Sequence, residues 1–415
     1  MTVKKRILYF MPDPPTRKDQ GNRIHVNQML EYFQSRSHFM EVDYMAVKEW
    51  AAWNEQDTRE FKINFPDIGL VLAHKKMSKS NKLKYLLRYK LPNKLRSFKK
   101  KYRKNLITDY TTIQIERDFN NQLQRKKYDI VIISYVIWAR LIDNNPHLNG
   151  AKLINDTHDF MTAQYKSRKN FLLGKTFEKE IELLSLFDEV WSQSADEQYL
   201  FSQFVPGNHQ FVPILYEDNM TEFSHQFNDS KYDIIYVGSD NENNKKSISW
   251  FFEYVYPLLP DAITICVVGL ICNHFPSFPN VEKHLFINDL SEYYLRSRIS
   301  ICPMLEGTGV KVKVVEAMSY GLPIVCNLRG LDGLPIKTDN GCLRSDTPEE
   351  FSIHIKKLLS NPSYYDSIRT LSRKTFTTYF EKKKVYKQLD HIFDLNTALN
   401  GKDHVVEKKA LAITA

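Results

Sequence analysis

The sequence has few cysteines, few glycines and no long apolar run. Its five cysteines show no Cys-x-x-Cys spacing, which disfavours a disulfide framework or a zinc site and favours a reducing cytosol. With 14 glycines and 42% hydrophobic residues in 415, the chain is neither collagen-like nor disordered. No stretch approaches the ~18 apolar residues of a membrane span, and the apolar run 7–11 stops at Pro12, too early for a secretory signal. We therefore expect a soluble, cytoplasmic protein of two or three folded domains.

Negative charge is also in short supply. The chain has 58 Lys and Arg against 49 Asp and Glu, a net charge of +9, so an anionic partner is expected. Fourteen of the cations lie between Lys75 and Lys104, a stretch without Asp or Glu and interleaved with leucines and aromatics. This pattern predicts contact with an anionic membrane surface through 75–104, and a solvated helical face is the main alternative. Nucleic acid could bind by the same chemistry but is not expected.

Strand-like apolar runs alternate with helical patterns in two series along the chain. The first series extends from 6–11 to 189–193 and the second from 234–237 to 323–327, with turn-forming residues between them. This alternation predicts an α/β protein with two Rossmann-like, doubly wound domains. The expected units are a first domain at 1–210, a linker at 211–232, a second domain at 233–375, a C-terminal helix at 376–397 packing back on the first domain, and a flexible tail at 400–415.

The segment 302–325 has the sharpest pattern. A predicted buried strand leads into the glycine loop 307–309, and a helix is expected to begin near Val310. Backbone N–H groups at such a helix start form an anion-binding site. Lys313 and Glu316 share a helix face, so one can neutralise phosphate while the other accepts hydrogen bonds from sugar hydroxyls. The alternative is an ordinary βαβ unit with a glycine turn and a surface ion pair.

A second candidate site follows the predicted strand that ends near Asn155. His158 lies in the stretch 155–159, where a doubly wound fold places ligands at the carboxyl edge of its sheet. Asp156 or Asp159 could orient His158 or act as a base toward an acceptor hydroxyl. A histidine with a purely structural role is the alternative.

The segment 302–325 resembles the donor-site signature of retaining glycosyltransferases of family 4. Further segments follow in the order of that family: Gly21-Asn22-Arg23, the stretch 156–159, Val237-Gly238-Ser239 and Asp289-Leu290. The resemblance implies a GT-B fold, in which two Rossmann-like domains face each other across a cleft. The residues that match the signature are Pro303, Gly307, Gly309, Lys311, Lys313, Glu316, Ala317, Met318, Gly321 and Pro323.

The resemblance also implies roles for single residues. Lys313 would contact the diphosphate of a nucleotide-sugar, Glu316 its ribose hydroxyls, and His158 the transferred sugar. It implies no metal and no other cofactor, because lysines and helix-start amides can offset the diphosphate charge. The remaining donor-binding residues implied are Gly21, Arg23, Ser239, Gly307, Thr308, Gly309 and Val310.

The sequence departs from the family pattern at several positions. Thr308 stands where many members have a first glutamate, and Leu305 and Ser239 stand where arginines are frequent. Sugar recognition would then fall to the 307–310 backbone, the Thr308 hydroxyl or Glu306. Candidates to replace the lost cations are Lys311, Lys245 and Lys246.

Together these features predict a metal-independent, hexosyltransferase-like glycosyltransferase. It would move a sugar from a nucleotide-sugar donor to a carbohydrate or lipid-linked acceptor with retention, in cell-surface polysaccharide or glycan assembly. It would act in the cytoplasm, with peripheral contact at the inner face of the cell membrane. The alternative is a non-catalytic polyanion-binding protein on an inactive double Rossmann scaffold. A nucleotide-sugar epimerase would need carboxylates flanking the sugar, which the sequence does not place.

Overall fold

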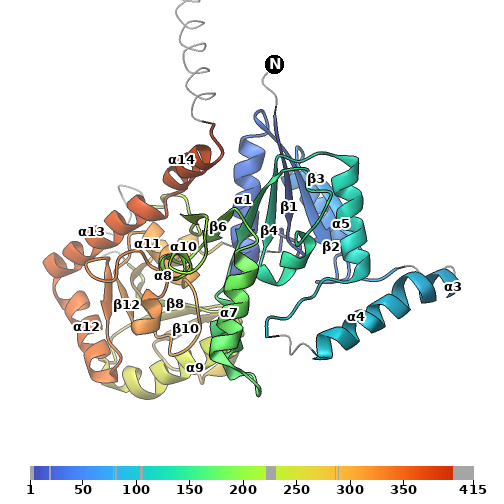
Figure 1. Cartoon of the computed structure of the whole chain (residues 1–415). Helices are drawn as coiled ribbons and strands as arrows, with labels where there is room; N and C mark the ends of the chain where they lie inside the picture. The colour runs from blue at the N-terminus through green and yellow to red at the C-terminus, as the bar shows by residue number, and fades with distance from the viewer. Residues whose placement is uncertain are drawn as a thin grey trace, which may run out of the picture.

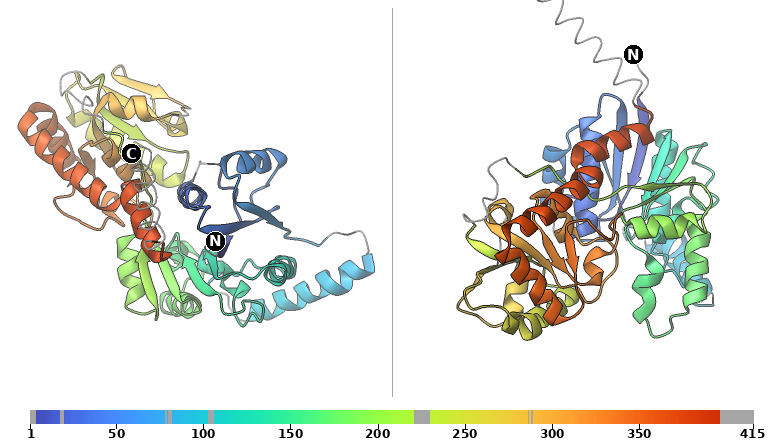
Figure 2. Two further views of the ribbon diagram at one scale, coloured as in Figure 1. Left: turned by 90° about the horizontal axis from the view of Figure 1, so that it is seen from above. Right: turned by 90° about the vertical axis from the view of Figure 1, so that its left-hand side faces the viewer.

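The structure is a computed structural model that describes residues 4–17, 20–77, 79, 82–102, 106–220, 230–285, 287 and 289–395. Two sheets with helices on their faces form two Rossmann-like domains that lie side by side (Figures 1 and 2). Every strand pair in both sheets is parallel. The predicted α/β class is therefore confirmed, and the predicted tail at 400–415 lies outside the described residues.

The first domain contains a seven-stranded sheet with strand order β3-β2-β1-β4-β5-β6-β7. Its strands are β1 (Lys5–Phe10), β2 (Met40–Val47), β3 (Gly69–Ala73), β4 (Ile130–Ser134), β5 (Lys152–Asp156), β6 (Glu189–Ser192) and β7 (Asn208–Phe211). Its helices are α1 (Gly21–Ser35), α2 (Glu55–Asn64), α3 (Lys82–Tyr85), α4 (Leu91–Tyr102), α5 (Ile113–Arg125), α6 (Met161–Gln164), α7 (Leu173–Leu184) and α8 (Ala195–Ser202), with shorter turns η1 (Leu86–Lys90), η2 (Val136–Leu141) and η3 (Tyr165–Ser167).

The second domain contains a six-stranded sheet with strand order β10-β9-β8-β11-β12-β13. Its strands are β8 (Tyr232–Val237), β9 (Ile265–Val268), β10 (Val281–His284), β11 (Ser297–Cys302), β12 (Ile324–Cys326) and β13 (Cys342–Arg344). The helices that follow β8 are α9 (Glu242–Trp250), α10 (Ser291–Leu295), α11 (Val312–Ser319), α12 (Pro348–Ser360), α13 (Pro362–Tyr379) and α14 (Lys382–Ile392), with the shorter turns η4 (Phe251–Val255), η5 (Tyr256–Leu258), η6 (Leu270–His274) and η7 (Leu328–Leu331).

The central strand β1 shows how the sheet is buried on both faces. Ile7 and Tyr9 point into one apolar cluster, whereas Leu8 and Phe10 point into the other, because successive side chains of a strand alternate. All four side chains are fully buried. Parallel sheets need this double cover of helices.

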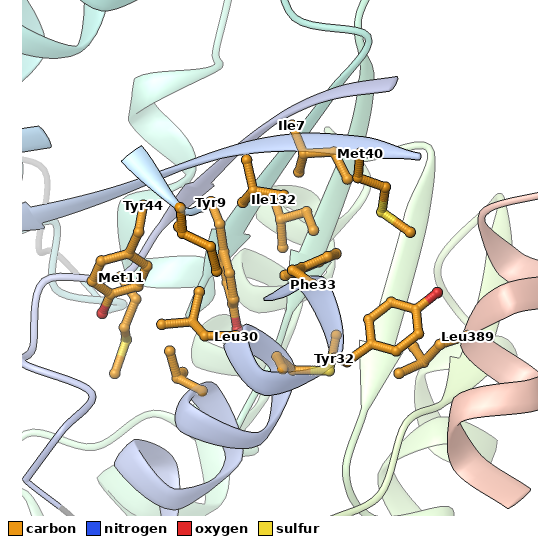
Figure 3. Close-up of a cluster of buried hydrophobic side chains, with 14 of the residues drawn as sticks. Ile7, Tyr9, Met11, Leu30, Tyr32, Phe33, Met40, Tyr44, Ile132 and Leu389 are labelled. Atoms are coloured by element: carbon orange, nitrogen blue, oxygen red, sulfur yellow. The ribbon is translucent and has the colours of Figure 1, made fainter. Parts of the chain in front are cut away.

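The C-terminal helices connect the two domains. Val385 and Leu389 of α14 belong to the apolar cluster of the first sheet, and Leu389 lies beside Tyr32 of α1 (Figure 3). The chain therefore passes from the second domain back to the first, as Figure 2 shows.

The expected single helix at 376–397 is wrong in detail, because the chain breaks between α13 and α14. Tyr216, in the crossing between the domains, donates its N–H to the carbonyl of Phe380 and accepts from the N–H of Lys382. These bonds form an isolated bridge between Tyr216 and Glu381. The helical ladder ends here because the crossing segment takes the backbone groups that would continue it.

Candidate functional site

Two adjoining cavities lie between the domains, at the carboxyl ends of the strands. Cavity A, about 770 Å³, is lined by α1 of the first domain and by β8, α11 and their loops in the second. Cavity B, about 550 Å³, is lined by the loops after β4 and β5 and by the loop before α11. Gln20, Gly21, Val310 and Val312 line both cavities, so the two are continuous at this point. Such an edge is where doubly wound folds bind ligands.

Lys313 and Glu316 both line cavity A from α11. The Lys313 ammonium donates to Asn244 Oδ1 at 2.9 Å and lies 4.3 Å from the centroid of the Tyr236 ring. Glu316 Oε2 accepts from the Tyr294 hydroxyl at 3.2 Å. The alternative, a surface ion pair between these residues, does not occur in the described structure, and each side chain is held separately at the cavity wall.

Burial shifts the pKa of both side chains toward neutrality. It lowers the pKa of Lys313 to about 8, because an ammonium loses hydration in the protein interior. It raises the pKa of Glu316 to about 7 for the same reason with opposite sign. Buried ionisable groups at a cavity wall are typical of binding sites, where a ligand supplies the missing partner.

The starts of two helices meet where the cavities join. Neither Gln20 before α1 nor Lys311 before α11 caps its helix with a side chain. A Cβ atom at Gly21 would lie 3.3 Å from Val312 Cγ2, so the two helix starts approach closely. The Arg23 N–H already donates to Asn22 Oδ1 at 2.9 Å. The first N–H groups of a helix have no acceptor within the helix, so those of Gly21 and Val312 can donate to an anion, which the two helix dipoles favour.

Lys311 holds the glycine loop 307–309 before α11 through hydrogen bonds to the backbone. Its ammonium donates to the carbonyl oxygens of Gly309 and Thr308 and lies 3.6 Å from Asp332 Oδ2. Gly307 and Gly309 have positive φ angles of 109° and 68°, which glycine adopts without strain. Lys311 thus shapes the loop and also lines cavity A, where it is a second cation beside Lys313. Helix α11 begins at Val312, two residues after the predicted Val310.

Asp156 is the centre of a buried polar network beside cavity B. It accepts from the Tyr9 hydroxyl at 2.8 Å, and its oxygens lie 3.4 and 3.2 Å from Nε2 of His25 and His158. Burial opposes ionisation of Asp156, but the two imidazoles outweigh it and hold its pKa well below the usual value. Asp156 itself lines neither cavity, and of its imidazole partners His158 lines cavity B.

His158 lines cavity B, but its ring nitrogens already face protein partners. Nδ1 lies 2.7 Å from Gln193 Nε2, and Nε2 faces Asp156. The ring stacks on Tyr135 with centroids 4.6 Å apart, and the residue has a left-handed φ of 57°. The expected hydrogen bond from this ring to a sugar would therefore have to replace the Gln193 contact. Strained backbone of this kind is concentrated at functional sites.

Some of the other predicted site residues line cavity A or cavity B, and two of them line neither cavity. Asp159, Thr308, Gly309 and Val310 line cavity B, and burial raises the pKa of Asp159. Ser239 and Val310 line cavity A. Arg23 and Gly307 line neither cavity: Arg23 pairs with Asp13 at 3.2 Å, and Gly307 lies near Asn243.

Lys245 and Lys246, the candidates to replace the lost arginines, pair with carboxylates at the surface. Lys246 pairs with Glu306 at 2.6 Å, and both side chains are about half exposed. Lys245 pairs with Asp240 and Glu242. Glu306 is therefore engaged on the surface and does not bend into the cavity, which corrects that expectation.

Sequence reasoning missed several site residues. His25, Gln193 and Tyr135 surround His158, and Asn244 and Tyr294 hold Lys313 and Glu316. The helical spacing of 24–33 placed His25 on the core side of α1, which was the one available signal. The others come from strands and loops that only the tertiary fold brings together.

The arrangement of two facing Rossmann-like domains is the GT-B fold of glycosyltransferases. Residues 231–361 match the family model "Glycosyl transferases group 1". Among solved structures, Anabaena HepE in complex with UDP-glucose superimposes with a TM-score of 0.64 at 12% identity, covering 94% of this chain and 99% of that one. The sucrose-phosphate synthase of Thermosynechococcus elongatus gives 0.64 at 14% identity, covering 95% and 100%.

A third similar structure is TarM, with a TM-score of 0.65 at 10% identity, covering 94% of this chain and 99% of that one; a TarM structure from S. aureus contains UDP. At these identities the structures show the shared fold, so the predicted GT-B architecture is confirmed. Together with the family model they support a glycosyltransferase. No curated protein matches the sequence.

The described part of the chain has neither a membrane-spanning helix nor a metal-binding cluster. None of its helices combines the length and apolarity needed to cross a bilayer. Within the same residues, no three His, Cys, Asp or Glu side chains gather as ligands for a metal ion.

Proposed function

We propose that the protein transfers a sugar from a nucleotide-sugar donor to a carbohydrate or lipid-linked acceptor, with retention of configuration. The carrying observation is that Lys313 and Glu316 line an interdomain cavity beside the close approach of two uncapped helix starts. This arrangement has a cation, a hydrogen-bond acceptor and free backbone donors in one place. A nucleoside diphosphate offers the complementary groups.

In this proposal the donor extends through both cavities. The diphosphate lies at the starts of α1 and α11 beside Lys313, and the ribose hydroxyls donate to Glu316. The base lies toward Ile287 and Leu290 of cavity A. The sugar enters cavity B past Thr308, whose neighbouring glycine leaves the backbone accessible. The relative HepE was solved with UDP-glucose, which supports a donor of this class.

The proposed chemistry needs little from the protein beyond electrostatics. As the bond to the leaving phosphate lengthens, positive charge develops on the sugar carbon. The buried Asp156 carboxylate, acting through His158, stabilises this charge. The leaving phosphate takes the proton of the acceptor hydroxyl, so the acceptor attacks from the same face. Lys313 and the helix starts stabilise the departing diphosphate without a metal.

We further propose that the arm 82–102 contacts an anionic membrane surface during transfer. Figure 1 shows α3 and α4 projecting from the first domain. Leu83, Leu87 and Leu95 on this arm are 66%, 55% and 65% exposed, and its sequence has no acidic residue. Exposed leucines beside lysines and arginines are typical of helices that lie in a membrane interface. This contact would place the enzyme on the membrane as a peripheral protein.

A thermal-shift screen tests the proposed donor class. UDP-, GDP-, dTDP- and CMP-sugars are added with and without EDTA, and one of them is expected to stabilise the protein by about 2.7 kcal/mol at a hundredfold its Kd. EDTA should leave the shift unchanged. DNA binding with a steep salt dependence and no shift with any nucleotide would instead favour a polyanion-binding protein.

A further inference from the structure

A third cavity adjoins cavity B on the first domain. Cavity C, about 730 Å³, shares Tyr165 and Arg168 with cavity B, so the two are continuous along this wall. Its lining differs from that of cavities A and B, because cationic and apolar side chains lie next to each other. These side chains are Arg168, Lys169, Leu106, Phe171 and Leu172.

Arg168 stands at the junction of cavities B and C. Its guanidinium lies 3.2 Å from the centroid of the Tyr165 ring, and Nη1 donates to Thr108 Oγ1 at 3.1 Å. Among the residues that the structure describes, no carboxylate lies within ion-pair distance of it, and no other Lys or Arg lines cavity B. A fixed guanidinium with donors to spare is the side chain that proteins use to bind phosphate.

The order of the linings gives the order of chemical groups in a ligand. Cavity B holds His158 and the loop 308–310, where the proposed reaction takes place. Arg168 comes next, and the apolar wall at Leu106 and Phe171 follows in cavity C. A ligand that fills this path has a hydroxyl-bearing sugar, then an anion, then an apolar chain.

We infer that the acceptor is an amphiphile with a phosphate between its reacting sugar and an apolar chain. Arg168 binds the phosphate, and the beginning of the chain lies in cavity C. Lys169 adds a second cation on the same wall. This inference rests on the proposed transferase function and adds the class of its acceptor.

The surroundings of cavity C fit the arrival of such a molecule from a membrane. Leu172 and Leu173 beside it are 42% and 65% exposed. Leu106 belongs to the segment that returns from the basic arm to the domain. In Figure 1, α4 and α7 extend from the same lower side of the first domain. An anionic lipid held at the arm would therefore reach cavity C without crossing the protein.

Calorimetric titration of the whole protein with decyl phosphate, below its micelle concentration, tests the site. Decyl glucoside supplies the chain without phosphate, and inorganic phosphate supplies the anion alone. Decyl phosphate is expected to bind more tightly than either by about tenfold or more. Arg168→Ala should remove this advantage, whereas Arg140→Ala should keep it, since Arg140 is exposed and lines none of the three cavities.

Two neighbouring leucines provide a matched test of the apolar wall, because Leu172 lines cavity C and Leu173 does not. Leu172→Glu places a charge in the lining of cavity C, and Leu173→Glu places the same charge one residue away, outside the lining. Leu172→Glu should weaken decyl phosphate binding about tenfold, and Leu173→Glu should not. Equal effects of the two variants, equal effects of Arg168→Ala and Arg140→Ala, or inorganic phosphate binding as tightly as decyl phosphate would overturn the inference.

The donor site is tested separately, with the same wild-type preparation. If decyl phosphate binds as expected but no nucleotide-sugar does, the proposed donor function fails and the anion site stands. If nucleotide-sugars bind and decyl phosphate does not, the inference fails and the proposed function stands.

Discussion

Burial at the wall of cavity A determines the ionisation of Lys313 and Glu316. Each side chain lies at a cavity wall with one or two neutral hydrogen-bond partners and no counter-ion within the described residues. Their pKa values therefore lie at about 8 and about 7, close to each other and to neutral pH. A ligand that needs a cation and an acceptor side by side would bind best between these two values.

This proximity predicts a bell-shaped pH dependence of nucleotide affinity. A bound diphosphate favours the charged form of Lys313, so affinity should fall as pH rises above about 8. Ribose hydroxyls favour the ionised form of Glu316, so affinity should rise as pH increases through about 7. Measurement of the nucleotide Kd in a series of buffers from acidic to basic pH checks the rise and the fall of affinity. Glu316→Gln should remove the acidic limb and Lys313→Arg the basic limb; unchanged profiles would contradict the assignment.

Asp156 gives a second prediction at the scale of single residues. Asp156→Asn keeps the size of the side chain and its contact with Tyr9 but removes the negative charge behind His158. The rate of transfer should fall by about 10²-fold or more, with nucleotide affinity within a factor of two. Tyr9→Phe is the control, because it removes the neighbouring hydrogen bond and leaves the charge. If the Asp156→Asn and Tyr9→Phe variants transfer sugar at equal rates, Asp156 has only a structural role.

At the scale of elements, the sequence predicts buried strands better than edge strands. β1, β4 and β8 each contain a run of apolar residues that predicts a strand, because central parallel strands are buried on both faces. β7 and β10 are short, polar and half-exposed, so their alternation carries little signal. The break before α14 depends on Tyr216, a distant residue that no local pattern reveals.

The arm 82–102 yields a prediction for an element as a whole. Protein should co-sediment with vesicles that contain anionic lipid and not with zwitterionic vesicles, and added salt should weaken the interaction. Leu87→Ser combined with Leu95→Ser should reduce binding about tenfold or more, since each buried leucine contributes about 1.5–3 kcal/mol.

Ile63→Ser provides the matched control for the arm. Ile63 is 76% exposed on α2 and lies outside the arm, so its replacement removes exposed apolar surface elsewhere. Vesicle binding by Ile63→Ser should equal that of the unmodified protein. If both changes reduce binding alike, the arm is a solvated surface and not a membrane contact.

At the scale of the whole molecule, the two domains are joined at a second place besides the C-terminal helices. Asp196 at the start of α8 accepts from the Gly333 N–H at 2.8 Å and from the Lys337 ammonium at 2.7 Å. Gly333 has a φ of 78°, and a Cβ atom there would lie 2.4 Å from Val310 Cγ2. The two domains thus touch directly beside the cavities.

This contact predicts that domain closure and donor binding are coupled. Asp196→Ala should loosen the contact between the domains and raise the Kd for the nucleotide-sugar by about two- to tenfold. Without donor, the Asp196→Ala variant should show a larger radius of gyration in X-ray scattering than the unmodified protein. Donor binding should reduce this radius. Asp143→Ala is the control, because Asp143 is an exposed residue of the first domain whose carboxylate accepts from its neighbour Asn144. Unchanged scattering and affinity for Asp196→Ala would show that closure does not depend on this contact.

The candidate site could be predicted in part because one segment carries most of its chemistry. The loop 307–310, Lys313 and Glu316 are close in sequence, so spacing alone places them together. The surroundings of His158 come from α1, β5 and the loops after β4 and β6, which meet only in the folded domain. Arg23 shows the limit of local reasoning, because a carboxylate ten residues away pairs with it.

The central claim is that Lys313 and Glu316 bind a nucleotide-sugar for transfer. The most direct measurement is the release of free nucleotide from the donor that stabilises the protein, in the presence of EDTA, by the unmodified protein and by Lys313→Ala and Glu316→Ala. The account predicts release by the unmodified protein and a loss of about 10²-fold or more in each variant. Release at the same rate by all three proteins would contradict it.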